Sequence, residues 1–240
     1  MIKNTLLISL ILFSFFCYGQ NQSKAPNPLN EQTIVRGEDG MVYPYNIWQS
    51  LLRTGKYSIR SRNTKSDKGE PEYLIYELSA EQRKAIMDKM PKPRTSDAFQ
   101  EGEAFKGFKV TDMNGNKYDL RTNTGNVIVL NFWFINCPPC KAEIPELNEL
   151  VKSYADNKEV IFLAVALDSK YEIKDFLKTN PYQYNIIDDG RFMADKYGVK
   201  SYPTHAVIGK DGIVKFGTVG LAFNTVSYIK KTIDEALTAK

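Results

Sequence analysis

The second half of the chain alternates between uninterrupted apolar runs and apolar residues at helical spacing. Residues 127–134 are apolar except for Asn131, which is typical of a central strand covered on both faces. Directly afterwards, apolar residues recur at helical spacing through residues 144–154. Further strands are expected at 160–166, 184–187, 204–208 and 213–219, and further helices at 172–179, 192–197 and 224–239. Strands that alternate with helices and end in a hairpin and a helix predict an α/β sheet with an antiparallel edge.

Two short motifs predict tight turns. Asn114-Gly115 lies between strand-like segments at 108–110 and 117–120, and this dipeptide is strongly favoured in hairpin turns. Lys210-Asp211-Gly212 gives the same signal between the last two strands. The α/β domain, expected to span residues 100–240, therefore begins with a β-hairpin.

The first half of the chain has a weaker pattern. Residues 20–33 are polar and contain prolines, so we expect a flexible tether there. Residues 34–99 are expected to form a small α+β appendage of unknown role, followed by a linker that begins at Pro91. Within it, 72–78 has the composition of a strand. Ser79 is followed three positions later by Gln, which is the spacing of a capping box at the start of a helix.

Residues 1–19 have the parts of a secretory signal peptide. A single positive charge precedes the apolar run 6–16, and small residues stand at the −3 and −1 positions before Gln20. The run is shorter than the roughly 18 residues expected of a spanning helix. We therefore expect export to the periplasm or cell envelope. Lipidation at Cys17 is the alternative, although the bulky Phe16 before it fits a bacterial lipobox poorly.

Composition and charge exclude several classes of protein. With 42% hydrophobic and 25% charged residues, the chain reads as an ordinary globular protein. The net charge of +4 is not concentrated in any Lys/Arg cluster, so nucleic acid is not an expected partner. Removal of residues 1–19 would leave only two of the three cysteines, Cys137 and Cys140. The fold must then rest on its own core, in a compartment that permits disulfides.

Cys137 and Cys140 lie where the central strand gives way to a helix. The N–H groups at a helix N-terminus lack internal partners and the helix dipole is positive there, so a thiolate is favoured. A thiol in this position has a lowered pKa, and the thiolate is the attacking form. We therefore expect Cys137 to be the more exposed, attacking sulfur and Cys140 to resolve the mixed disulfide.

Pro138 and Pro139 separate the two cysteines. Because a residue before proline avoids the helical region, Cys137 and Pro138 are expected to be non-helical, with Pro139 in the first helical position. Neither proline has an N–H to donate to the Cys137 thiolate, and a less stabilised thiolate makes the couple less oxidising. This favours a reductase over a strong oxidase.

Two other interpretations of the cysteine pair, a zinc site and a structural disulfide, have less support in the sequence. A zinc ion takes about four ligands, and His205, the sole histidine, is the only further soft ligand. A purely structural disulfide would close so short a loop that it would constrain the unfolded chain little. No metal and no cofactor is therefore expected. His205 itself leaves two interpretations open, a contact with the active site or a satisfied position in a strand.

Two longer motifs carry a family resemblance. Residues 129–133 (VLNFW) lead into 137–145 (CPPCKAEIP), and residues 197–204 (YGVKSYPT) are followed by 209–212 (GKDG). Together these resemble the exported TlpA/ResA-like branch of the thioredoxin superfamily, over residues 104–240. The resemblance implies a thioredoxin-like α/β fold and protein thiol–disulfide oxidoreductase activity through a redox-active Cys137–Cys140 disulfide.

The resemblance also implies roles for single residues. Pro203 matches the cis-proline that packs against the disulfide and docks substrate, and Tyr202 beside it is expected in the same substrate-binding surface. Glu143 matches an acid that lies near the inner cysteine and tunes its proton transfer, so it is expected to be catalytic. Pro145 matches the proline that kinks the active-site helix. Asn131 stands where cytoplasmic thioredoxins carry a buried Asp, which leaves Glu143 as the main nearby acid.

Asn136 departs from the family pattern, which usually has Trp before the first cysteine. A smaller, polar side chain at this point of the substrate-binding surface indicates a substrate different from the usual one.

The leading hypothesis is an exported oxidoreductase that reduces disulfides of envelope proteins and is recharged by a membrane thiol–disulfide electron donor. The second is a Sco-like copper-binding chaperone on a similar fold, because Cu(I) favours thiolates. That class, however, spaces its cysteines as CxxxC. The third is a peroxidase on a thioredoxin-like scaffold, although peroxiredoxins lack this CxxC arrangement.

Overall fold

The computed structural model describes residues 29–122 and 125–239. The predicted signal peptide and residues 20–28 of the predicted tether lie outside the described residues. Two compact units are present, the described part of Met1–Gln49 with Ile59–Ile75, and Ser50–Ser58 with Tyr76–Lys240. Within the described ranges, none of the helices is both long enough and apolar enough for a membrane span.

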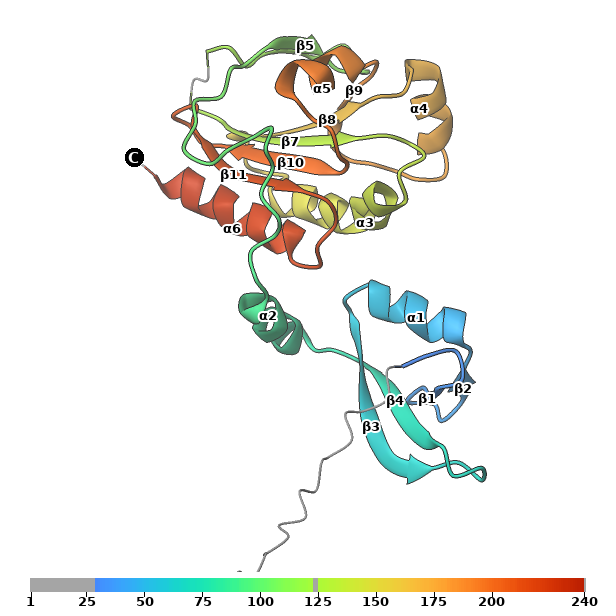
Figure 1. The fold of residues 1–240 in the computed structure, drawn as a ribbon. Coiled ribbons are helices and arrows are strands. Elements are labelled where there is room, and N and C mark those ends of the chain that lie inside the picture. The colour runs from blue at the N-terminus through green and yellow to red at the C-terminus, as the bar shows by residue number, and fades with distance from the viewer. Residues whose placement is uncertain (1–28, 123–124, 240) are drawn as a thin grey trace, which may run out of the picture. The chain divides into compact units, whose positions relative to one another are not determined.

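A five-stranded sheet lies at the centre of the larger unit (Figure 1). Its strands are β7 (Val127–Trp133), β8 (Val160–Ala166), β9 (Asn185–Ile187), β10 (Thr204–Ile208) and β11 (Val214–Val219). The order is β11-β10-β7-β8-β9. Strands β7, β8 and β9 are parallel, whereas β10 is antiparallel to β7 and β11 is antiparallel to β10. The predicted α/β sheet with an antiparallel edge is confirmed.

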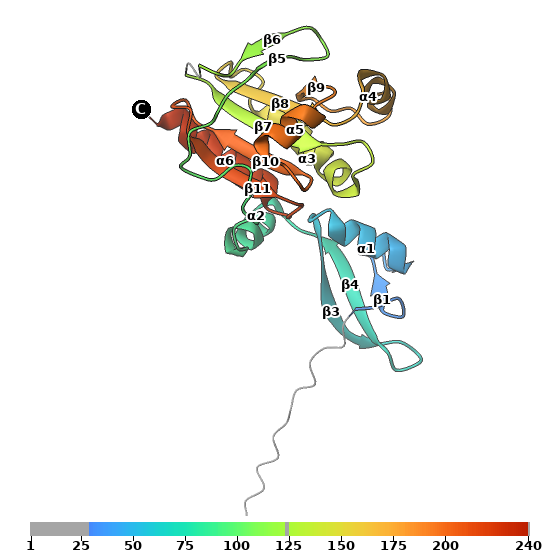
Figure 2. The same ribbon diagram turned by 45° about the horizontal axis from the view of Figure 1, so that its top comes forward.

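Helices cover both faces of this sheet. They are α3 (Pro138–Ser153), α4 (Lys170–Leu177), α5 (Arg191–Tyr197) and α6 (Thr225–Thr238). Helices α3 and α6 lie on one face, and α5 lies on the other (Figures 1 and 2). Because both faces are covered, every residue of β7 is buried, which accounts for its nearly continuous apolar sequence.

The predicted N-terminal hairpin consists of β5 (Lys109–Thr111) and β6 (Lys117–Asp119), which pair antiparallel. Gly115 takes a φ of 90° in the turn, a conformation that glycine adopts without steric cost. Phe108 and Leu120, on either side of the hairpin, pack in the same core cluster as Ala194 of α5. The hairpin therefore helps to cover the α5 face of the sheet.

Part of the segment that the sequence assigns to the linker is bound to this unit. Thr95 bridges to Thr218 of β11, and Ser96 donates its backbone N–H to the carbonyl of Gly217 at 3.1 Å. Phe99 is 3% exposed, and its ring lies 5.6 Å from that of Phe132 on β7. Phe99 thus belongs to the core of the α/β unit.

The N-terminal part of the chain contains a second sheet together with helices, so it is an α+β segment. It contains β1 (Ile34–Arg36), β2 (Val42–Tyr43), α1 (Tyr45–Arg53), β3 (Tyr57–Lys65), β4 (Pro71–Glu77) and, after the sheet, α2 (Ala80–Lys89). The strand order is β2-β1-β4-β3. The predicted strand at 72–78 corresponds to β4, and the predicted capping box of Ser79 and Gln82 is formed at the start of α2.

Candidate active site

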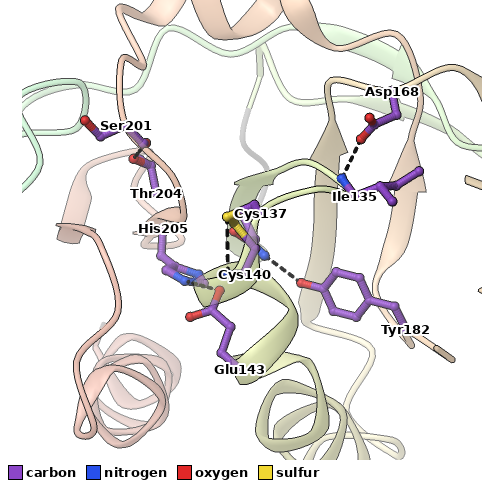
Figure 3. Close-up of a disulfide and its surroundings, with 10 residues drawn as sticks. Ile135, Cys137, Cys140, Glu143, Asp168, Tyr182, Ser201, Thr204 and His205 are labelled. Atoms are coloured by element: carbon purple, nitrogen blue, oxygen red, sulfur yellow. Dashed lines mark hydrogen bonds and ion pairs between the residues drawn. A yellow bond between two sulfur atoms is a disulfide. The ribbon is translucent and has the colours of Figure 1, made fainter. Parts of the chain in front are cut away.

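The two candidate redox cysteines are joined in a disulfide at the start of α3 (Figure 3). Cys137 is the N-cap residue, with an extended backbone of φ −99° and ψ 101°. The backbone N–H of Cys140 donates to Cys137 Sγ at 3.3 Å. The helix N-terminus therefore presents a hydrogen-bond donor to the sulfur of Cys137, where a thiolate is favoured. In this disulfide form the two cysteines are about equally covered, 2% and 1% exposed, so the expected greater exposure of Cys137 is not seen.

Helix α3 begins one residue earlier than predicted. The backbone N–H of Lys141 donates to the carbonyl of Cys137 at 3.1 Å, which places Pro138 in the first turn together with Pro139. Cys137 and Pro138 each precede a proline, and a residue in that position prefers the extended region. Cys137 is extended, whereas Pro138 is helical because the hydrogen bond from Lys141 closes the first turn around it. Pro145 lies inside α3, where it has no N–H to continue the helical hydrogen bonds, as expected of the residue that kinks this helix.

Asp168 holds the segment that leads into the disulfide. It follows β8, and its Oδ2 accepts the backbone N–H of Ile135 at 2.7 Å. Ile135 lies between the end of β7 and Cys137. The segment that follows the parallel neighbour of the central strand thus fixes the backbone just before Cys137.

The peptide bond between Tyr202 and Pro203 is cis, as the family resemblance implied for Pro203. The ring of Tyr202 is half-buried and meets the ring of Phe134 edge-on, with centroids 5.4 Å apart. The carbonyl of Phe134 in turn accepts the backbone N–H of Cys137 at 3.2 Å. The cis-proline loop therefore packs beside the segment that carries the disulfide.

Asn136 is exposed directly before Cys137. Its side chain makes no hydrogen bond within the part of the chain that the structure describes. It is therefore accessible to a partner.

Glu143 and His205 face each other beside the disulfide (Figure 3). Glu143 lies three residues after Cys140, so the two share one face of α3. His205 lies on β10, two residues after Pro203. Nε2 of His205 is 2.9 Å from Oε1 of Glu143, a short contact that is not aligned as a hydrogen bond. The two side chains are 0% and 2% exposed, so the contact between them is shielded from water.

Uncharged polar groups surround this pair. Asn131 of β7 lies opposite His205 in the sheet, and its Nδ2 donates to the hydroxyl of Tyr182 at 2.8 Å. Burial raises the pKa of Tyr182 and of Tyr184 well above the usual value, and the nearby charge of Glu143 adds to the effect. Both phenols are therefore neutral at physiological pH.

Sequence reasoning missed Asp168 and Tyr182 and left His205 open. The signal for Asp168 was its position after β8, because the carboxyl ends of parallel neighbouring strands meet at one edge of a sheet. For His205 the signal was its distance from Pro203, since Pro203 directly precedes β10, the strand that carries His205 and pairs with β7. Tyr182 lies outside any strand and carried no signal.

Residues 102–216 match the AhpC/TSA family. The ResA thiol-disulfide oxidoreductase of Bacillus thuringiensis (strain Al Hakam) is 33% identical over 123 residues, which cover 51% of this chain and 71% of that protein. The thioredoxin-like protein YneN of Bacillus subtilis is 31% identical over 124 residues, 51% of this chain and 73% of YneN.

Solved structures give the same result. A protein assigned as the thiol:disulfide interchange protein DsbE of Chlorobium tepidum has a TM-score of 0.52 and 28% identity, covering 58% of this chain and 99% of its own. A protein of Bacteroides thetaiotaomicron, assigned as a protein disulfide isomerase, has a TM-score of 0.55 at 20% identity, over 61% and 95% of the two chains. At that identity it supports the fold alone.

The fold and the CxxC disulfide at the start of α3 define a thioredoxin-like redox domain. The chain belongs to the thiol–disulfide oxidoreductases of the thioredoxin superfamily that include ResA and YneN. The predicted fold class, family and oxidoreductase activity are confirmed.

Proposed function

We propose that this oxidoreductase reduces disulfides of exported proteins through the dithiol of Cys137 and Cys140. The observation that carries the proposal is the hydrogen bond of 3.3 Å from the backbone N–H of Cys140 to Cys137 Sγ. It supports Cys137 as the nucleophile, because a donor at the helix N-terminus stabilises a thiolate there.

In the first step, the Cys137 thiolate attacks one sulfur of the substrate disulfide. An S–S bond forms between Cys137 and the substrate, and the other substrate sulfur leaves with the bonding electrons as a thiolate. In the second step, Cys140 loses its proton and its sulfur attacks Cys137 Sγ. The second substrate thiolate then leaves, so the two electrons of the dithiol have passed to the substrate and the Cys137–Cys140 disulfide has formed.

Glu143 is the proposed proton acceptor for Cys140. Its place on the same face of α3 and its burial support this role. A buried thiolate is costly, so a base that takes the proton as the sulfur attacks lowers the barrier of the second step.

Tyr202, Pro203 and Asn136 form the proposed substrate-binding surface. Tyr202 and the cis Pro203 pack beside the segment that leads to Cys137, and Asn136 is exposed next to the sulfur. A polar Asn136 in place of the family's usual Trp supports a substrate with a polar contact at this point.

The reducing direction rests on Pro138 and Pro139. Both lie in the first turn of α3 without an N–H to offer, so Cys140 supplies the donor to Cys137 Sγ. A thiolate that accepts fewer hydrogen bonds is less stable, so the disulfide form is favoured. The dithiol is therefore more readily oxidised and is the better reductant. A reductase must be re-reduced, and in the periplasm or cell envelope a membrane thiol–disulfide carrier is the proposed donor.

Substrate trapping tests the proposal. A Cys140→Ala variant cannot carry out the second step, so it should accumulate mixed disulfides with exported proteins, each attached at Cys137. The matched Cys137→Ala variant should trap none. Adducts that form equally on Cys137→Ala would contradict the assigned roles.

A further inference from the structure

Glu143 and His205 bury two ionisable groups against one another. The groups come from α3 and β10, and Nε2 and Oε1 are 2.9 Å apart (Figure 3). Among the described residues, Glu143 makes no other ion pair, and neither Glu143 Oε2 nor His205 Nδ1 has a hydrogen-bonding partner. His205 is therefore the group in the described structure that is placed to balance a negative charge on Glu143.

In the described part of the chain, the neighbours of His205 in the sheet supply no compensating positive charge. In the sheet, His205 lies opposite Asn131 on β7 and Thr218 on β11, and both are uncharged. The titratable groups near the pair are Cys137, Cys140, Tyr182, Tyr184 and Glu146. The two tyrosines are neutral at physiological pH because burial raises their pKa. Partial desolvation and the charge of Glu143 raise the pKa of Glu146, whose side chain lies at the surface of α3, whereas the cations Lys56 and Arg83 act on Glu146 in the opposite direction.

Burial restricts the number of protons that the pair can hold. An unpaired charge in a protein interior is strongly unfavourable, whereas a carboxylate beside an imidazolium is neutral as a unit. Loss of a proton would leave a buried carboxylate without a cation, and gain of a proton would leave a buried cation without an anion. The favoured resting state holds one proton, in the disulfide form and in the dithiol form alike.

We propose that His205 is a positioning residue that keeps Glu143 in its carboxylate form, so that Glu143 can accept the proton of Cys140. This inference rests on the proposed function, in which Cys140 resolves a mixed disulfide at Cys137. The proton passes from Cys140 Sγ to Glu143, the sulfur forms the bond to Cys137 Sγ, and the substrate sulfur leaves as a thiolate. While Cys140 is a thiolate, the doubly protonated pair carries one positive charge that offsets it. Once the disulfide has closed, the pair releases one proton to solvent.

Replacement of His205 by Gln would leave the carboxyl group of Glu143 buried without a cation. Burial then favours the neutral acid. A protonated carboxyl cannot accept the Cys140 proton, so the second step would need a higher pH. The first step, in which Cys137 attacks, does not use the pair and should be retained.

The two steps can be observed separately with dithiobis(nitrobenzoate) and the reduced protein. Attack by Cys137 releases one coloured thiolate at a rate proportional to reagent concentration, and resolution by Cys140 releases a second at a rate independent of it. In His205→Gln, we expect the second release to slow about tenfold near neutral pH, and its pH midpoint to rise by about one unit. The rates of variant and wild type should converge at alkaline pH. Tyr184→Phe, which removes a buried hydroxyl without a hydrogen-bonding partner in the described structure, is the matched control and should leave the midpoint in place.

The outcomes separate the two proposals. Absence of the first release in the wild type would contradict the proposed function. A normal first release with an unchanged or lowered midpoint in His205→Gln would overturn only the role of His205.

A second measurement needs no variant at this position. His205 is the sole histidine, so nitrogen NMR of histidine-labelled wild-type protein gives one imidazole pattern. We expect the imidazolium pattern near neutral pH in both redox states, and its loss in Glu143→Gln. A neutral imidazole in the wild type would overturn the inference.

Discussion

The carboxylate of Asp168 accepts the backbone N–H of Ile135 at 2.7 Å, which connects the segment after β8 to the segment that precedes α3. Ile135 belongs to the short segment between β7 and the disulfide, and Asp168 follows β8. The contact therefore fixes the backbone that positions Cys137 through a residue 33 positions away in sequence.

Removal of this carboxylate should loosen the segment. A hydrogen bond to a charged group contributes about 1.5–3 kcal/mol, and Asp168 is half-buried, so Asp168→Ala should lower the free energy of unfolding by about 1–2 kcal/mol. Urea unfolding of the disulfide form would measure the loss. The matched control is Asp175→Asn, which breaks only an exposed ion pair with Lys178 and should leave stability unchanged.

The two cysteines should differ in reactivity once the disulfide is reduced. Cys137 is the N-cap residue and its sulfur accepts the N–H of Cys140, so it should be alkylated much faster than Cys140 near neutral pH. Mass spectrometry after short exposure to iodoacetamide would locate the modified residue. Equal rates, or faster modification of Cys140, would reverse the assigned roles.

The reduction potential should depend on Pro139 more than on Pro138. An N-cap group accepts hydrogen bonds from the second and third helical N–H groups, and Pro139 removes the second. Pro139→Ala restores this donor, which is worth about 1 kcal/mol, so the couple should become more oxidising by about 20 mV. Equilibration with defined glutathione mixtures measures the shift, and Pro138→Ala should give a smaller one. An unchanged potential in both variants would remove the argument for the reducing direction.

The hairpin should show a pH-dependent contribution to stability through Asp112. Burial raises its pKa, but hydrogen bonds from Asn116, Asn114 and Tyr118 outweigh this, so the pKa of Asp112 is lowered in the folded state. A depressed carboxyl pKa contributes stability above the unfolded value of about 3.9, and the contribution is lost as pH falls through the folded value.

Asp112→Ala should therefore be less stable than the wild type at neutral pH. The difference should narrow as pH falls below about 4, where the wild-type carboxyl begins to be protonated in the unfolded chain. Urea titrations of both proteins at several pH values test this. A constant difference down to low pH would show that the loss comes from packing rather than from the charge.

The central elements were predictable because their signals are local. Residues 160–166 form β8 with the predicted bounds, since a continuous apolar run of this length has few alternatives. Predicted helix starts were one or two residues late at α3, α4 and α5. At α4, Ser169 and Glu172 form a capping box that places the helix start at Lys170 rather than at Glu172.

The rest of the site depends on contacts between residues far apart in sequence. Glu143 and His205 are brought together by the packing of α3 against a strand that enters the sheet much later. Spacing along the chain does not indicate how close two such residues lie in the folded protein. A lone His on an apolar strand has the same sequence pattern whether it contacts the active site or only fills a position in the strand. Strand β3 was missed for another reason. Residues 60–64 of this strand are all exposed, so it lacks the apolar alternation that predicts a strand.

Cys140 takes part in exchange through two chemically independent groups. Its side-chain sulfur is the proposed resolving thiol, whereas its backbone N–H is the donor to Cys137 Sγ. A substitution at position 140 removes the first and keeps the second. Attack and resolution can thus be separated genetically at one residue, and a protein that lacks the resolving thiol still presents an activated nucleophile for capturing its natural substrates.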